Sequence, residues 1–189
     1  MNFLNLDMQT ILIILVLGHI LTAILILSYT SQHHKDQSVN TFLFSKLFQL
    51  IAWIILAMKN MIPGVYLICA GNSLLFTGAA YELIALLILT NSYSKTVKRF
   101  YNILMIACIL IFNIVVICGY NESERIVAAS LITAALMAFP IYTLLRTKNS
   151  SILQKVISVF YVITIIFLLC RAYIAFTFAH GMTLWSTNI

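Results

Sequence analysis

The chain has 189 residues, of which 62% are hydrophobic and only 8% are charged. Because a soluble domain carries roughly 45–50% apolar and about 25% charged residues, this composition excludes a soluble globular protein. The net charge of +6 belongs mainly to short loops between apolar runs. It therefore does not indicate nucleic-acid binding, and the composition predicts a polytopic α-helical membrane protein whose partner is the lipid bilayer.

Six apolar runs have the length of about 20 residues that crosses a hydrocarbon core of roughly 30 Å. The predicted helices cover residues 8–29, 40–58, 63–89, 100–118, 125–145 and 156–179. Together they form one all-α integral membrane domain, 1–189, and the alternation typical of an outer-membrane barrel is absent. No basic segment precedes the first run and no small-residue cleavage site follows it, so we expect the first helix to remain in the mature protein.

The two prolines fall at different kinds of position in these helices. Pro63 suits a first helical turn, where its missing N–H would be unpaired in any case. Pro140 lies inside the helix predicted over 125–145, and we expect it to kink that helix or to end it early.

Basic residues predict the orientation of the helices. Cytoplasmic loops of membrane proteins carry an excess of Lys and Arg. The opposite side holds only Lys59 and Arg125. The first, third and fifth loops hold Lys35, Lys46, Lys95, Lys98, Arg99, Arg146, Lys148 and Lys155. We therefore expect these loops in the cytoplasm and both ends of the chain outside, so that a cytoplasmic output domain after Ile189 would require a seventh helix.

Two ionisable residues stand well inside predicted spans. Glu82 is the acid and Arg171 the base, and charges at membrane depth often mark function. We expect the two side chains to pair and hold the third helix against the sixth, although Glu82 is nearer the cytoplasm and Arg171 nearer the outside. Gly71 and Gly78 share the helical face of Glu82, and small residues there favour close helix packing.

Other polar residues in the spans have simpler explanations. Asn72 is an intramembrane amide for which an interhelical hydrogen bond is favoured over contact with a ligand. Trp53 and Lys59 are predicted to anchor a helix end at the membrane interface, and binding of an anionic ligand by Lys59 is the less favoured alternative. The histidines lie at different depths, so we expect no metal, haem or other cofactor. Without a catalytic constellation, the chain is not expected to be an enzyme.

One hairpin carries a resemblance to known proteins. Trp53, Lys59, Pro63, Asn72 and Gly78 follow one another at spacings of six, four, nine and six residues. This pattern resembles the N-terminal multi-pass sensor region of bacterial GGDEF diguanylate cyclases and of some sensor histidine kinases. The resemblance covers residues 40–100, and Lys59 stands where those proteins usually have Arg.

The resemblance implies a sensory input module in the bacterial cytoplasmic membrane. It also implies a homodimer and a cytoplasmic signalling domain in a longer parent protein, since this chain carries no GGDEF segment. Two alternatives come from other classes of protein. A small solute transporter would be expected to show an inverted repeat of broken helices, and the spans show none. An intramembrane enzyme is the least favoured.

Overall fold

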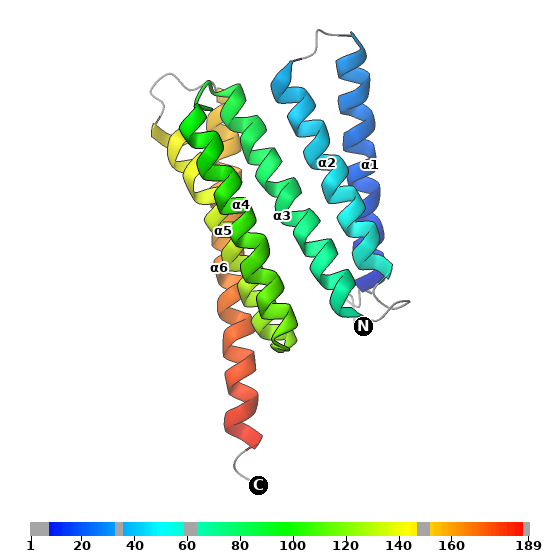
Figure 1. The fold of residues 1–189 in the computed structure, drawn as a ribbon, viewed down its shortest axis with the longest axis vertical. Coiled ribbons are helices and arrows are strands. Elements are labelled where there is room, and N and C mark those ends of the chain that lie inside the picture. Colours follow the sequence, from blue (N-terminus) through cyan, green and yellow to red (C-terminus); the bar gives the residue numbers. More distant parts are fainter. Residues whose placement is uncertain (1–7, 33–35, 59–63, 147–151, 187–189) are drawn as a thin grey trace, which may run out of the picture. The chain divides into compact units, whose positions relative to one another are not determined.

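A computed structural model describes residues 8–32, 36–58, 64–146 and 152–186, and within them it describes side chains over 13–28, 36–58, 64–146, 152 and 154–177. The described chain is helical apart from short turns (Figure 1). The six helices are α1 (Met8–Gln32), α2 (Gln37–Ala57), α3 (Gly64–Leu89), α4 (Lys95–Ile117), α5 (Glu122–Arg146) and α6 (Ile152–Ser186). The predicted all-α class with six helices is confirmed.

The length and composition of these helices suit a membrane. Five of them are long and apolar enough to cross one: α2, α3, α4, α5 and the Gln154–Thr177 part of α6. The described side chains of α1 form a shorter apolar stretch, Ile13–Ser28. The chain is therefore a multi-pass membrane protein, and its many exposed aliphatic and aromatic side chains are suited to contact with lipid.

Polar caps explain why three helices begin earlier than the sequence predicts. The carboxylate of Asp36 accepts a hydrogen bond from the Ser38 amide (3.1 Å) and starts α2. At α5, the Asn121 side chain accepts from the Glu124 amide (2.9 Å), and the Glu124 carboxylate accepts from the Asn121 amide (3.0 Å). This reciprocal arrangement satisfies N–H groups that the first turn leaves unpaired. Ser94 caps α4 through its side chain, which accepts a hydrogen bond from a backbone amide of the first turn.

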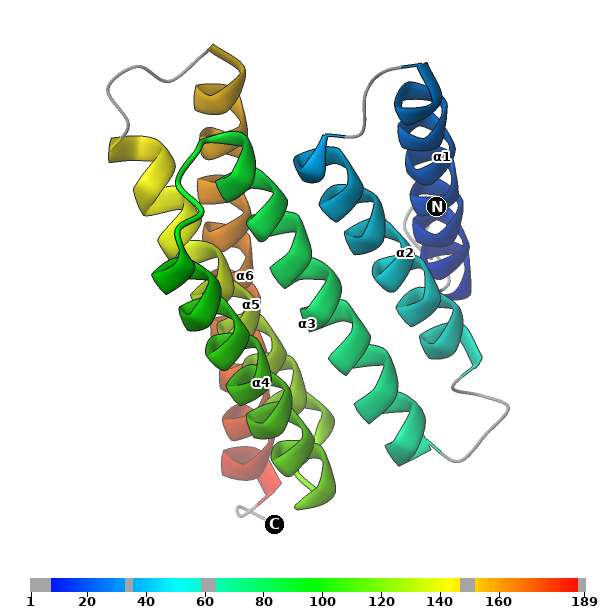
Figure 2. The ribbon, with the colours of Figure 1, turned by 45° about the horizontal axis from the view of Figure 1, so that its top comes forward.

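Contacts divide the chain into two compact units. Unit 1 is Met1–Leu89 and unit 2 is Thr90–Ile189. In unit 1, α2 packs against both α1 and α3; in unit 2, α5 packs against both α4 and α6 (Figures 1 and 2). The sequence alone predicted one domain, whereas the contacts of the structure are concentrated within two units.

Glycines bring α3 close to α2 in unit 1. A Cβ atom added at Gly78 would lie 2.6 Å from Cγ of Gln49 and 3.0 Å from the backbone oxygen of Ser45. At Gly71 it would lie 2.7 Å from Cγ of Leu56. The two helices are also joined where the Ser38 hydroxyl donates to the Ala85 carbonyl (3.0 Å). The face shared by the two glycines is therefore the contact face between α3 and α2.

Pro140 lies inside α5, which continues to Arg146. It therefore does not end the helix early, and the kink that the sequence predicts as the alternative stays a prediction. A proline has no N–H, so the carbonyl four residues earlier loses its helical donor. That carbonyl belongs to Leu136, and it accepts a hydrogen bond from the Tyr101 hydroxyl of α4 instead (3.1 Å). Tyr101 and Leu136 are fully buried. The side chain from α4 thus replaces the donor that Pro140 removes.

Candidate functional site

Four side chains from the three helices of unit 1 form one hydrogen-bonded group, which we call the polar cluster: His19 on α1, Lys46 and Gln49 on α2, and Glu82 on α3. Lys46 is nine residues from the start of α2, or about 13 Å along the axis. The cluster therefore lies within the helices and well away from their ends.

The charged members of the cluster form an ion pair. Nζ of Lys46 lies 2.8 Å from Oε2 of Glu82, and the two side chains are 14% and 22% exposed. The ammonium group also lies 4.9 Å from the centre of the Phe42 ring, an arrangement that attracts a cation to the ring face. An ion pair in this setting neutralises two charges that would each be costly alone in hydrocarbon.

Gln49 links the ion pair to α1. Its amide nitrogen donates to Oε2 of Glu82 (2.9 Å), and its amide oxygen accepts from Nζ of Lys46 (3.2 Å). The same amide oxygen lies 2.9 Å from Nε2 of His19. Gln49 is buried, so its amide is satisfied entirely by protein groups. Gln49 thus contacts each of the other three members of the cluster.

Ser45 lies one turn before Gln49 on α2. It is fully buried, and its hydroxyl has no hydrogen-bond partner among the residues that the structure describes. Because Ser45 carries no charge and stands outside the hydrogen-bonded group, its replacement by Ala provides a matched control for changes in the cluster.

The structure gives the predicted site residues different surroundings. Within unit 1, Glu82 has Lys46 as a cationic partner, and its expected pair with Arg171 stays a prediction. Arg171 is exposed on α6, in unit 2. Asn72 donates to the Ile68 carbonyl of its own helix (2.9 Å), in place of the expected bond to another helix. Trp53 is half-buried on α2.

Two further predicted residues, Lys59 and Pro63, lie outside the described residues. Their expected roles as interface anchor and helix start stay predictions.

Sequence reasoning missed Lys46 and Gln49 as site residues. Lys46 was counted among the loop cations, although it lies inside an apolar run with aromatic neighbours at 42, 44 and 48. The signal was the spacing of three residues between Lys46 and Gln49, which places both on one helical face. His19 was not predicted as a site residue either, and its partner on α2 is Gln49.

The described side chains contain no group of three or more His, Cys, Asp or Glu residues that could hold a metal ion. The four cysteines are separate thiols. The cluster instead offers one imidazole, one carboxylate and one ammonium joined through an amide. Such a set can hold and exchange protons.

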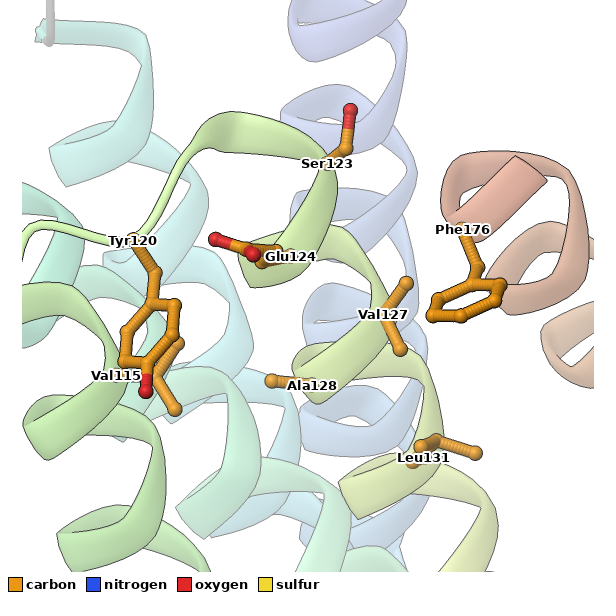
Figure 3. A pocket seen from close by; sticks show the side chains of 8 residues that line it. All are labelled: Val115, Tyr120, Ser123, Glu124, Val127, Ala128, Leu131 and Phe176. Carbon is orange, nitrogen blue, oxygen red and sulfur yellow. The ribbon is translucent and has the colours of Figure 1, made fainter. Parts of the chain in front are cut away.

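Unit 2 contains a groove of about 320 Å³ between the α4–α5 turn and α6 (Figure 3). Its lining residues are Val115, Tyr120, Ser123, Glu124, Val127, Ala128, Leu131 and Phe176. In Figure 3 the Glu124 carboxylate turns toward Tyr120 and away from Phe176. That carboxylate is already engaged in capping α5. The groove is therefore mainly an apolar surface, and the polar cluster is the stronger candidate for a functional site.

No protein-family model matches the chain, and the searches of curated proteins and of solved structures also found no match.

Proposed function

We propose that the chain is a membrane-embedded sensory or regulatory input module, with α1, α2 and α3 as its input unit. One observation carries the proposal: an ion pair and an imidazole are joined through Gln49 across all three helices of unit 1. The chain has only five acidic residues, and it places one of them, Glu82, well inside α3, beyond the first and last turns of the helix. Ionisable groups at that position are costly, and they commonly mark functional sites.

The cluster suits an input role because a local change of charge there acts on three helices at once. Its hydrogen bonds join α1 to α2 and α2 to α3. If a stimulus alters one member, the relative stability of two packings of these helices changes by the difference in interaction free energy. In this proposal the output is a cytoplasmic signalling domain, the chain acts as a homodimer, and the membrane is the bacterial cytoplasmic membrane, as the resemblance at residues 40–100 implies.

The separation of α1 and α3 tests this proposal directly. Spin labels placed at Ile14 and Tyr66, which are 57% and 85% exposed, would report that distance by double electron–electron resonance in lipid nanodiscs. The cysteines at 69, 108, 118 and 170 would first be replaced by Ala. We expect Glu82→Gln and Lys46→Met to shift the distance distribution, and Ser45→Ala to leave it unchanged. An identical single distance in all four proteins would contradict the proposal.

A second candidate function is a small solute transporter. The division into two units of three helices each supports it. A chain that crosses a membrane three times enters the next three spans from the opposite side, as in the inverted repeats of many transporters. Uptake of solute by proteoliposomes containing the full chain, lost in Glu82→Gln, would favour the transporter over the input module.

A further inference from the structure

We propose that the polar cluster is a proton-binding site, in which the proton sits on His19 and Gln49 transmits its presence to the Lys46–Glu82 ion pair. This inference rests on the proposed function, since it names the ligand of the input unit. Its first support is geometric: each imidazole nitrogen of His19 faces an oxygen atom. Nδ1 lies 2.7 Å from the Leu15 carbonyl, and Nε2 lies 2.9 Å from Oε1 of Gln49.

Oxygen atoms on both sides require a donor at both nitrogens. A backbone carbonyl only accepts hydrogen bonds, and a neutral imidazole has one donor and one acceptor. Either neutral tautomer of His19 would therefore place a nitrogen lone pair against an oxygen lone pair, at Leu15 or at Gln49. The imidazolium form donates to both oxygens, so the observed arrangement is the one that a bound proton stabilises.

The orientation of the Gln49 amide is fixed by charged partners. Its nitrogen faces the Glu82 carboxylate and its oxygen faces the Lys46 ammonium group. Rotating the amide by half a turn would place oxygen against carboxylate and nitrogen against ammonium, and both contacts would repel. The atom of Gln49 that faces His19 is consequently an oxygen, which accepts a hydrogen bond from a proton on Nε2.

Among the described side chains of α2 and α3, the charged groups linked to His19 are Lys46 and Glu82, both through Gln49. Tyr81 adjoins Glu82 in sequence, and its ring lies 5.7 Å from that of Phe48 on α2. With His19 protonated, the three ionised groups carry a net charge of one positive unit. With His19 neutral, the ion pair remains and the net charge is zero, so proton binding changes the charge at this depth by one unit.

Release of the proton has a defined consequence for the neighbouring helices. The proton passes from the imidazole to water, and His19 keeps only one of its two hydrogen bonds. If the Leu15 bond is kept, the Gln49 oxygen loses its donor from α1. Because Lys46 and Glu82 still hold the amide in its orientation, the Gln49 oxygen then faces the lone pair of Nε2, and this repulsion acts through Gln49 on the Lys46–Glu82 ion pair. The state of His19 on α1 thereby affects the contact between α2 and α3.

The first test observes the imidazole itself in the full chain. His33, His34 and His180 would be replaced by Gln, so that one ¹⁵N-labelled histidine remains, in nanodiscs. We expect both ring nitrogens to show the imidazolium signal at low pH and one of them to lose it as the pH is raised from about 5 to 8, the range in which the charge of histidine side chains changes. An imidazole that keeps one protonation state across this range would overturn the proposal.

The second test observes transmission along α2. Trp53 follows Gln49 by one helical turn, so its fluorescence in a Trp185→Phe background reports on that segment. We expect a pH-dependent signal that is lost in His19→Gln. In Gln49→Leu the imidazole should still titrate while Trp53 no longer responds, and Ser45→Ala should behave as the unaltered chain. A Trp53 response that persists in His19→Gln, or in Gln49→Leu, would overturn the proposal.

Failure of this inference and failure of the proposed function are distinguishable. A His19 that does not titrate removes the proton as ligand, while Glu82→Gln can still shift the separation of α1 and α3. An unchanged separation together with a titrating His19 would instead retain the proton site and contradict the input module.

Discussion

Lys46 and Glu82 stabilise each other because each would otherwise stand as a lone charge inside an apolar helix. On insertion scales, the free-energy cost of such a charge at the centre of a span is about 2.5–3.5 kcal/mol. Removing one member of a buried pair costs about 3–5 kcal/mol because the other charge is left uncompensated. Replacing both members removes the interaction but leaves no uncompensated charge. The pair should therefore be far more sensitive to single than to double substitution.

We expect Lys46→Met and Glu82→Gln each to lower the free energy of unfolding by about 3 kcal/mol. The double variant should lose much less than the sum, because no lone charge remains. Unfolding of the full chain in detergent, followed by tryptophan fluorescence, would measure all three against Ser45→Ala as control. Additive losses would show that the two side chains act independently.

Tyr101 performs a role that follows from the missing N–H of Pro140. Tyr101→Phe should destabilise the chain by about 1 kcal/mol, because the Leu136 carbonyl then has no donor. In a Pro140→Ala background the helix supplies its own N–H, so the same change should cost clearly less. A double-mutant cycle on unfolding free energies would measure the coupling. Equal costs in both backgrounds would argue against this explanation of the contact.

At the scale of elements, the α2–α3 interface depends on backbone approach at its glycines. An added Cβ at Gly78 would meet a backbone oxygen as well as a side chain, and a backbone oxygen cannot move aside cheaply. At Gly71 the three nearest atoms all belong to the side chain of Leu56, and a side chain can move more easily than a backbone. At Gly18 on α1, nothing lies within 4 Å. The three glycines thus form a graded series within one unit.

We expect Gly78→Ala to destabilise the chain by about 1–3 kcal/mol, the usual range for overpacking, and Gly71→Ala to cost less. Gly18→Ala should be neutral or stabilising by up to about 1 kcal/mol, since Ala is the better helix former. Thermal unfolding in one detergent would rank the three variants. A Gly18 variant as unstable as the Gly78 variant would contradict this order.

Helix number and class followed from the sequence because apolar runs of membrane length have few other solutions. The helix starts did not, because Asp36, Ser94 and Asn121 act through local caps in segments that look like polar loops. Only part of the polar cluster could be predicted from the sequence. Glu82 stood out as an acid in an apolar run, but Lys46 was counted as a loop cation although the predicted helix 40–58 contains it. Which cation faces Glu82 depends on how α2 and α3 pack.

At the scale of the whole molecule, the position of Lys46 changes the count behind the predicted orientation. Without it, the loops predicted to be cytoplasmic hold seven Lys and Arg residues and the opposite side holds two, so the predicted bias keeps its sign. A reporter fused after Ile189 is therefore expected to lie outside, and one inserted in the Asn91–Ser94 turn inside. Activity of paired phosphatase and fluorescent-protein reporters would measure both. A cytoplasmic C-terminus would mean an inverted orientation or an uneven number of spans.

The ion pair also bears on the order in which the chain is made. Lys46 leaves the ribosome before Glu82, separated from it by 35 residues. Until α3 arrives, α2 carries a positive charge that the lipid disfavours. We infer that α2 and α3 enter the bilayer together as a helical hairpin, with Glu82 neutralising Lys46 during translocon exit. An early truncation between the two helices would then leave α2 poorly inserted.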